Sequence, residues 1–156
     1  MTSVVYSSTL PVTSGELFAF HLDPANLARI SPPIPPFRLL SAPRPTRAGD
    51  EQVFRLGFGP LGVTWRARIS RLKDGRLLED VQESGPFRRW RHQHQVQSEN
   101  GASRLTDVVS FRLVPTPLGE FVEFLLVRPA IFAMFAWRHR RTRSLLASVS
   151  DAAGKS

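Results

Sequence analysis

Residues 128–149 have the sequence RPAIFAMFAWRHRRTRSLLASV, the one sustained helical pattern in the chain. Pro129 suits a first helical turn, and no later proline interrupts the pattern. At 100° per residue, a single apolar stripe that also carries one imidazole runs along the helix. The stripe consists of Ile131, Phe132, Phe135, His139, Thr142, Leu146 and Val149. Each large apolar side chain gains about 1.5–3 kcal/mol on burial, so this helix is expected to pack against a sheet.

The middle of the chain supplies that sheet. Segments rich in strand-forming residues recur about every ten residues, with turn sequences between them. We predict strands at 37–42, 51–58, 63–72, 76–83, 87–97 and 103–114. Asp74-Gly75 and Asn100-Gly101 are typical of hairpin turns, so the strands should follow one another as an antiparallel meander. Residues 118–127 are expected to bridge the sheet and the long helix, and their own structure is left open.

Before this meander, the sequence predicts one strand and two short helices. Residues 3–10 have strand character, and Thr13 or Ser14 can cap the first helix. Asp23-Pro24 combines a capping acid with a proline at the first helical position, so a second helix begins there. The proline-rich segment 31–36 is expected to be a stiff connector rather than a recognition ligand. The fold class is therefore α+β, with about seven strands in a curved antiparallel sheet wrapped around a long C-terminal helix.

Length and composition narrow the functional classes. A chain of 156 residues is the size of one domain, and without cysteine it can form neither disulfides nor thiolate zinc sites. No window approaches the roughly 20 apolar residues that span a bilayer, so a cytoplasmic protein is expected. The chain has 21 basic and 13 acidic residues, a formal charge of +8. The arginines are dispersed apart from 88–91 and 138–143, which favours a solvated basic face over contact with nucleic acid or a membrane surface.

Strand alternation directs several polar side chains toward the helix. Asp80, Gln82, His92, His94 and Asp107 are expected to face the same interior as His139. Buried polar groups need hydrogen bonds or water, so this interior should contain a pocket as well as a core. The predicted ligand-binding residues are Phe54, Leu56, Trp65, Ile69, Leu78, Asp80, Gln82, Trp90, His92, His94, Asp107, Val109, Phe111, Ile131, Phe135 and His139.

Three interpretations of the histidines and carboxylates remain open. The preferred one is a satisfied hydrogen-bonding network that ties the strands to the helix. The second is acid–base catalysis, for which the candidates are His92, His94, Asp107 and His139. The third is a metal site built on His92 and His94, which is disfavoured because two histidines on one strand are a weak pattern. We therefore predict no metal and no cofactor. The sequence also lacks a Gly-x-Ser-x-Gly elbow and a phosphate-binding loop.

The order of elements and several short motifs resemble the START-like, Bet v 1-like helix-grip superfamily. This group is also described as SRPBCC, or polyketide cyclase/dehydrase and lipid-transport proteins. The motifs most similar to a bacterial subgroup of it are Phe18-Ala19-Phe20-His21 with Asp23-Pro24, Leu78-Glu79-Asp80-Val81-Gln82, Gly85-Pro86-Phe87, Trp90-Arg91-His92-Gln93-His94, Leu105-Thr106-Asp107-Val108-Val109 and Phe135-Ala136-Trp137-Arg138-His139-Arg140. Members of that subgroup occur alone or joined to a nucleoside-diphosphate-sugar-epimerase-like domain.

The resemblance implies one helix-grip domain, which we place at residues 1–150, with a disordered tail at 151–156. It further implies binding or transport of a small hydrophobic molecule, such as a lipid, a quinone or a polyketide, between the sheet and the C-terminal helix. A cyclase or dehydratase that uses histidine and aspartate acid–base chemistry is the alternative. A homodimer stays open.

Overall fold

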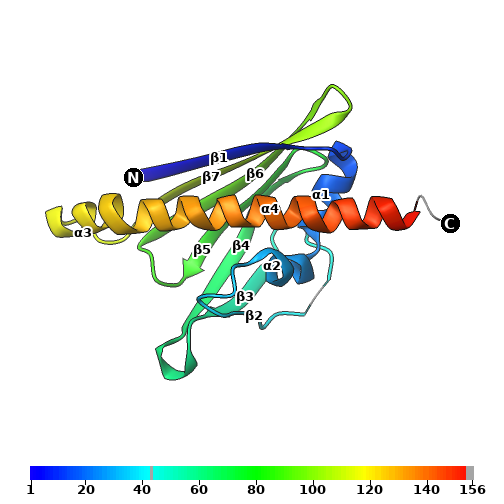
Figure 1. The fold of residues 1–156 in the computed structure, drawn as a ribbon. Helices are drawn as coiled ribbons and strands as arrows, with labels where there is room; N and C mark the ends of the chain where they lie inside the picture. Colours follow the sequence, from blue (N-terminus) through cyan, green and yellow to red (C-terminus); the bar gives the residue numbers. More distant parts are fainter. Residues whose placement is uncertain (43, 154–156) are drawn as a thin grey trace.

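The computed structural model describes residues 1–42 and 44–153, with side chains through residue 148, and confirms the expected α+β helix-grip fold. Figure 1 shows the sheet with the long helix α4 lying across it. In chain order the elements are β1 (Thr2–Leu10), α1 (Ser14–Leu22), α2 (Pro24–Ile30), β2 (Phe37–Leu39), β3 (Glu51–Leu56), the 3-10 turn η1 (Gly59–Leu61), β4 (Val63–Lys73), β5 (Leu77–Ser84), β6 (Arg89–Glu99), β7 (Ala102–Arg112), α3 (Pro117–Val122), the π-helical segment η2 (Glu123–Val127) and α4 (Arg128–Ala153).

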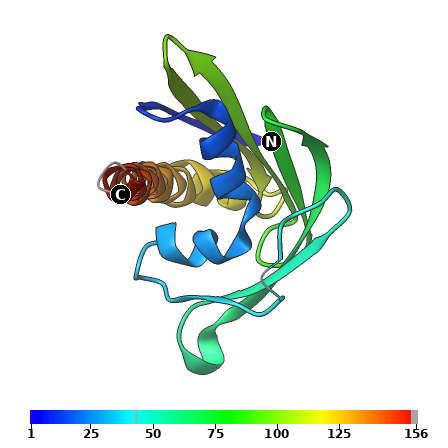
Figure 2. The ribbon, with the colours of Figure 1, turned by 90° about the vertical axis from the view of Figure 1, so that its right-hand side faces the viewer.

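All seven strands form one antiparallel sheet in the order β1-β7-β6-β5-β4-β3-β2. The pairing of β4 with β5 shifts register twice, between Arg66 and Ala67 and between Ile69 and Arg71. Such irregularities increase strand bending, and Figure 2 shows the sheet curving around the helices that occupy its concave side. The short helices α1 and α2 lie across the open side of this curve (Figure 2).

Both short helices begin at the residues that the sequence indicates. Thr13 caps α1 in a reciprocal arrangement with Glu16, in which each side chain pairs with the other residue's backbone N–H. Asp23 caps α2 by accepting a hydrogen bond from the backbone N–H of Ala25, and Pro24 occupies the first turn. These two caps fix the angle at which the chain passes from β1 to the proline-rich connector.

The C-terminal helical region is longer at both ends than predicted. Residues 118–127, the segment between the sheet and the long helix whose structure the sequence left open, are helical, because Thr116 caps a helix that starts at Pro117. The π-helical segment η2 ends at Val127, two residues before Pro129, and we attribute its wider turns to the missing N–H of that proline. At the other end α4 continues through Ala153. Residues 154–156 lie outside the described part of the chain.

The apolar stripe of α4 packs as predicted at most of its positions. Ile131, Phe135, His139 and Thr142 are buried, and Leu146 is partly buried against the core. The prediction for Phe132 was wrong, because this side chain is 50% exposed and meets mainly the edge of Tyr6 on the outermost strand β1. The side chain of Val149 lies outside the described ones.

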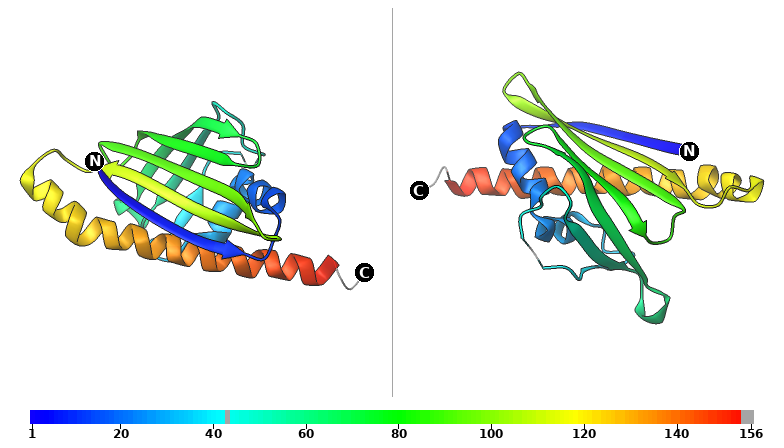
Figure 3. Two further views of the ribbon diagram at one scale, coloured as in Figure 1. Left: turned by 90° about the horizontal axis from the view of Figure 1, so that it is seen from above. Right: turned by 180° about the vertical axis from the view of Figure 1, so that it is seen from behind.

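The segment formed by α3 and η2 carries large apolar side chains that the sheet does not cover. Leu118, Phe121, Phe124, Leu125 and Leu126 are all more than half exposed. Figure 3 shows this segment projecting past the ends of the neighbouring strands. It is anchored through Glu123, which accepts hydrogen bonds from the Thr2 hydroxyl and from the backbone N–H of Leu113, both at 2.6 Å. Across the described residues, no helix combines the length and the hydropathy needed to cross a bilayer.

Replacing Phe135 with alanine should lower the free energy of unfolding by about 3–5 kcal/mol, because it opens a cavity in the core. Phe135 is 1% exposed and packs in the cluster that contains Trp90 and Phe111. Urea unfolding monitored by circular dichroism measures the effect. The matched control is Phe121→Ala in α3, where the side chain is 61% exposed and the change should stay within about 0.5 kcal/mol. Equal losses in both variants would contradict this assignment of the core.

Candidate functional site

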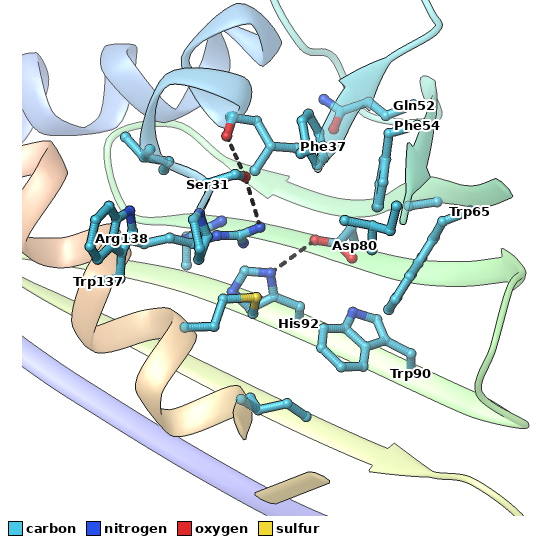
Figure 4. A pocket seen from close by; sticks show the side chains of 18 of the residues that line it. Ser31, Phe37, Gln52, Phe54, Trp65, Asp80, Trp90, His92, Trp137 and Arg138 are labelled. Carbon is cyan, nitrogen blue, oxygen red and sulfur yellow. Dashed lines mark hydrogen bonds and ion pairs between the residues drawn. The ribbon is translucent and has the colours of Figure 1, made fainter. Parts of the chain in front are cut away.

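A cavity of about 780 Å³ lies between the sheet, the α2–connector region and α4. This volume is within the range of pockets that bind small molecules. Figure 4 shows its aromatic side, where Phe54 and Trp65 stand side by side near Trp90. The rings of Phe54 and Trp65 stack at 5.5 Å, and those of Trp65 and Trp90 meet edge to face at 4.9 Å. Phe37 and Phe87 extend this apolar wall at its two ends.

The structure separates the residues predicted to bind the ligand into two groups. Those on the cavity wall are Phe54, Leu56, Trp65, Ile69, Leu78, Asp80, Trp90, His92, His94 and Ile131. Those elsewhere are Gln82, Asp107, Val109, Phe111, Phe135 and His139. In the second group, Gln82 hydrogen-bonds the backbone of Phe87 in the β5–β6 turn, and the others are packed between the sheet and α4. Alternation along β7 places Val109 and Phe111 on the correct face, but α4 covers that part of the sheet.

Apart from Ile131, the residues that the helices and the connector contribute to the cavity wall were not among the predicted ligand-binding residues. The α1–α2 region and the connector contribute Phe20, His21, Asn26, Ile30, Ser31 and Ile34. A second face of α4, at helical spacing beside the buried stripe, contributes Ala130, Met134, Trp137 and Arg138. That spacing was present in the sequence, but these residues fall off the main stripe. Arg138 therefore lines the cavity and does not belong to the solvated basic face, and Trp137 lies beside it on the cavity wall.

The polar part of the interior is organised around the Asp107 carboxylate on β7. It is 2% exposed and lies against three imidazoles. His92 donates from Nε2 to Oδ1 at 3.0 Å, and His139 donates from Nε2 to Oδ2 at 2.6 Å. His94 touches the same carboxylate through Nδ1 without regular hydrogen-bond geometry. Burial opposes ionisation of Asp107, but these imidazoles outweigh it and hold its pKa well below the usual value.

His92 connects this buried group to the cavity. Its Nδ1 lies 3.2 Å from Oδ1 of Asp80, whose side chain is 19% exposed on the cavity wall (Figure 4). Burial alone would lower the pKa of His92. Hydrogen bonds to Asp107 and Asp80, together with their charges, reverse this effect and raise the pKa to about 9. At neutral pH His92 is therefore an imidazolium between two carboxylates, and both of its nitrogens are engaged.

Two further histidines on the cavity wall, His21 and His94, are neutral, because for them burial outweighs the attraction of the carboxylates. Burial and the neighbouring His94 lower the pKa of His21 to about 3. The pKa of His94 is also lowered, first by burial and then by the charge of His92, against the opposing effect of Asp107. The two rings lie 4.8 Å apart. Nδ1 of His21 forms a hydrogen bond with the backbone carbonyl oxygen of Leu17. Because a carbonyl oxygen can only accept, Nδ1 is the donor and carries the proton of this neutral ring.

The side chains of His92, His94 and Asp107 also meet the distance criterion for a metal site, with candidate ligand atoms within 4.8 Å of one another. However, both imidazoles lie directly against the same oxygen of Asp107. Zinc bonds of about 2.0–2.2 Å in tetrahedral geometry would hold these atoms farther apart than such direct contacts. The arrangement therefore matches the hydrogen-bonding network that the sequence analysis preferred.

The comparisons with known proteins agree with this architecture. The family model described as polyketide cyclase/dehydrase and lipid transport matches residues 10–135. No curated protein matches the sequence significantly.

Solved structures with the same fold come from several sources. A protein from Rhodobacter sphaeroides aligns with a TM-score of 0.73 at 13% identity, covering 94% of this chain and 93% of the other. A nucleoside-diphosphate sugar epimerase from Corynebacterium glutamicum aligns with a TM-score of 0.69 at 22% identity, covering 97% of this chain and 30% of the longer one. The protein Ara h 8.0201 aligns with a TM-score of 0.61 at 14% identity, covering 90% and 97%. These likenesses establish the fold, including the expected similarity to an epimerase-linked domain.

The raised pKa of His92 predicts that stability falls on the alkaline side. Because the folded-state pKa of about 9 exceeds the unfolded value of about 6.5, the stabilisation is complete below pH 6.5 and is lost as pH rises through 9. The expected loss in free energy of unfolding between these pH values is about 3 kcal/mol. In His92→Gln this decline should be absent. Urea unfolding at intervals from pH 6 to 9.5 measures how the free energy of unfolding of the wild type and of His92→Gln depends on pH. An equal decline in both proteins would contradict the assignment of the raised pKa to His92.

Proposed function

The chain belongs to the polyketide cyclase/dehydrase and lipid transport family, and on this premise we propose that it binds one small, largely apolar molecule in the cavity beneath α4. The observation that carries the proposal is the cavity itself, with a volume of about 780 Å³ and walls made mainly of apolar side chains. A protein interior normally closes such a space, because each unfilled volume forfeits packing contacts. A ligand that fills it would recover those contacts.

The aromatic wall favours a ligand with a flat ring system. Phe37, Phe54, Trp65 and Trp90 form a nearly continuous surface, in which neighbouring ring centres are 4.9–5.5 Å apart. Rings stack or meet edge to face on such surfaces, which adds about 0.5–1.5 kcal/mol per pair beyond the burial of area. A polyketide-like or quinone-like body fits this wall better than a flexible alkyl chain, which gains only non-directional burial.

A substitution that fills the cavity should block binding without damaging the fold. Ala67 on β4 faces the cavity, so Ala67→Phe should weaken binding about tenfold or more, equivalent to 1.4 kcal/mol or more. Ala147→Phe on the exposed side of α4 is the matched control and should leave affinity unchanged. Displacement of the fluorescent probe 1-anilinonaphthalene-8-sulfonate measures affinity, and native mass spectrometry of the purified protein detects molecules that it retains. Equal affinity of both variants, with no retained apolar molecule, would refute the proposal.

A second candidate function is proton transfer on the bound molecule, which the contact between Asp80 and His92 favours. Asp80 lines the cavity, and its carboxylate forms an ion pair with the imidazolium of His92. The Asp80 carboxylate could remove a proton from a carbon between two carbonyl groups, and the electron pair would move to one carbonyl oxygen as an enolate. The enolate carbon could then attack a third carbonyl farther along the same molecule, whose oxygen would take the proton back from Asp80. This sequence closes a ring by forming one carbon–carbon bond, with no external reactant.

Asp80→Asn tests that candidate, because the amide cannot accept the proton yet has nearly the same shape. If Asp80 is the base, turnover of a linear poly-β-ketone should fall by about 100-fold or more while affinity for the substrate changes little. Liquid chromatography of the cyclised product measures turnover. The control is Asp74→Asn in the exposed turn between β4 and β5, which neither lines the cavity nor belongs to the network around His92. A rate in Asp80→Asn equal to that of the wild type would leave binding as the sole function.

A further inference from the structure

Arg138 is a cation placed among apolar side chains of the cavity. It lies on α4 between Trp137 and the buried imidazole of His139, and its guanidinium points across the cavity toward Asp80 in Figure 4. Its polar contact within the protein is a long one, 3.4 Å from Nη2 to the Ser31 hydroxyl. The guanidinium also lies 5.5 Å from the centre of the Phe135 ring.

Within the described part of the chain, the Arg138 guanidinium makes one hydrogen bond, the long one to Ser31. Its Nε is buried and, among the described residues, has no hydrogen-bond partner. A guanidinium has five N–H donors in a planar fork that suits two oxygens of one anion. Arg138 is half-buried, so enclosure of its Nε without a partner is unfavourable, and burial lowers the pKa of Arg138.

The carboxylates nearby do not provide the missing partner. No carboxylate of the described residues lies within 4.0 Å of the Arg138 guanidinium. Asp107 is enclosed by imidazoles, and Asp80 is paired with the imidazolium of His92. Both attract Arg138 through space, which helps to keep it charged, but neither satisfies its donors.

We propose that the ligand carries one compact anionic oxygen group, such as a carboxylate, which binds to Arg138 beside Ser31 while its apolar body lies on the aromatic wall. This inference rests on the proposed function and names the chemical class of the ligand. The anion would accept hydrogen bonds from the guanidinium and from the Ser31 hydroxyl, which now donates to the backbone carbonyl of Leu27 and would have to rotate. On the opposite side of the cavity, the imidazolium of His92 partly neutralises the negative charge of Asp80, so Asp80 repels the anion less strongly.

A matched pair of fluorescent probes separates the head group from the body. 1-Pyrenebutyric acid and 1-pyrenebutanol share a flat apolar body, and only the acid is anionic at pH 7.5. Wild-type protein should bind the acid about 10- to 100-fold more tightly than the alcohol, the range expected for hydrogen bonds to a charged group. Arg138→Met should abolish this preference while the alcohol binds as before. Arg138→Lys, which keeps the charge, should retain part of the preference and guards against a folding defect in the methionine variant.

The control for charge is Arg141→Met, an exposed arginine on the same helix that does not line this cavity. It removes one positive charge and should leave the preference intact, which excludes a general electrostatic effect of the chain's +8 charge. Equal affinity for acid and alcohol in the wild type would overturn the inference about Arg138 while supporting the cavity as a binding site. Failure of both probes to bind, with no displacement of 1-anilinonaphthalene-8-sulfonate, would count against the proposed function itself.

Discussion

The buried carboxylate of Asp107 is the constraint on which the interior depends. A carboxylate so enclosed is strongly unfavourable unless hydrogen bonds and opposite charge compensate it. Here β6 supplies His92 and His94, α4 supplies His139, and β1 reaches the cluster through Ser8, whose hydroxyl lies 2.6 Å from Nδ1 of His139. Unlike apolar packing, these contacts have defined directions. They therefore fix the rotation and the axial position of α4 against the sheet.

That fixed position divides the concave side of the sheet into two parts with different roles. Toward β1 and β7, α4 lies close to the strands, and Val109, Phe111 and Phe135 form a packed core. Toward β3 and β4, the sheet curves away while α2 and the connector cover the opening, so the cavity remains there. The network stands at the border between these parts. A change that loosened Asp107 would thus shift α4 and alter both the core and the cavity.

The sequence was sufficient for the fold but for only part of the site. Strand alternation correctly turned His92, His94 and Asp107 inward, because a period of two is unambiguous on a half-buried sheet. It could not show that α4 covers β7 and leaves β4 open, since this depends on where the strands bend. It also missed Arg138, because a single stripe cannot describe a helix that faces a core on one side and a cavity on the other. Phe132 was misplaced for the same reason, at the outer border of that stripe.

The same network bears on whether the cavity holds or transforms its ligand. Catalysis by proton transfer needs an acceptor that is free to take the proton. Both nitrogens of His92 are engaged, and Asp107 has contacts on both oxygens, so within the described network Asp80 is the carboxylate that meets the cavity. Asp80 is itself paired with the imidazolium of His92. This ion pair would have to weaken when Asp80 takes up a proton. Arg138, in contrast, has a buried Nε that lacks a partner among the described residues, and an anion could bind the guanidinium with no ion pair to break. The geometry is therefore more complete for holding a ligand with an anionic group than for reacting with it.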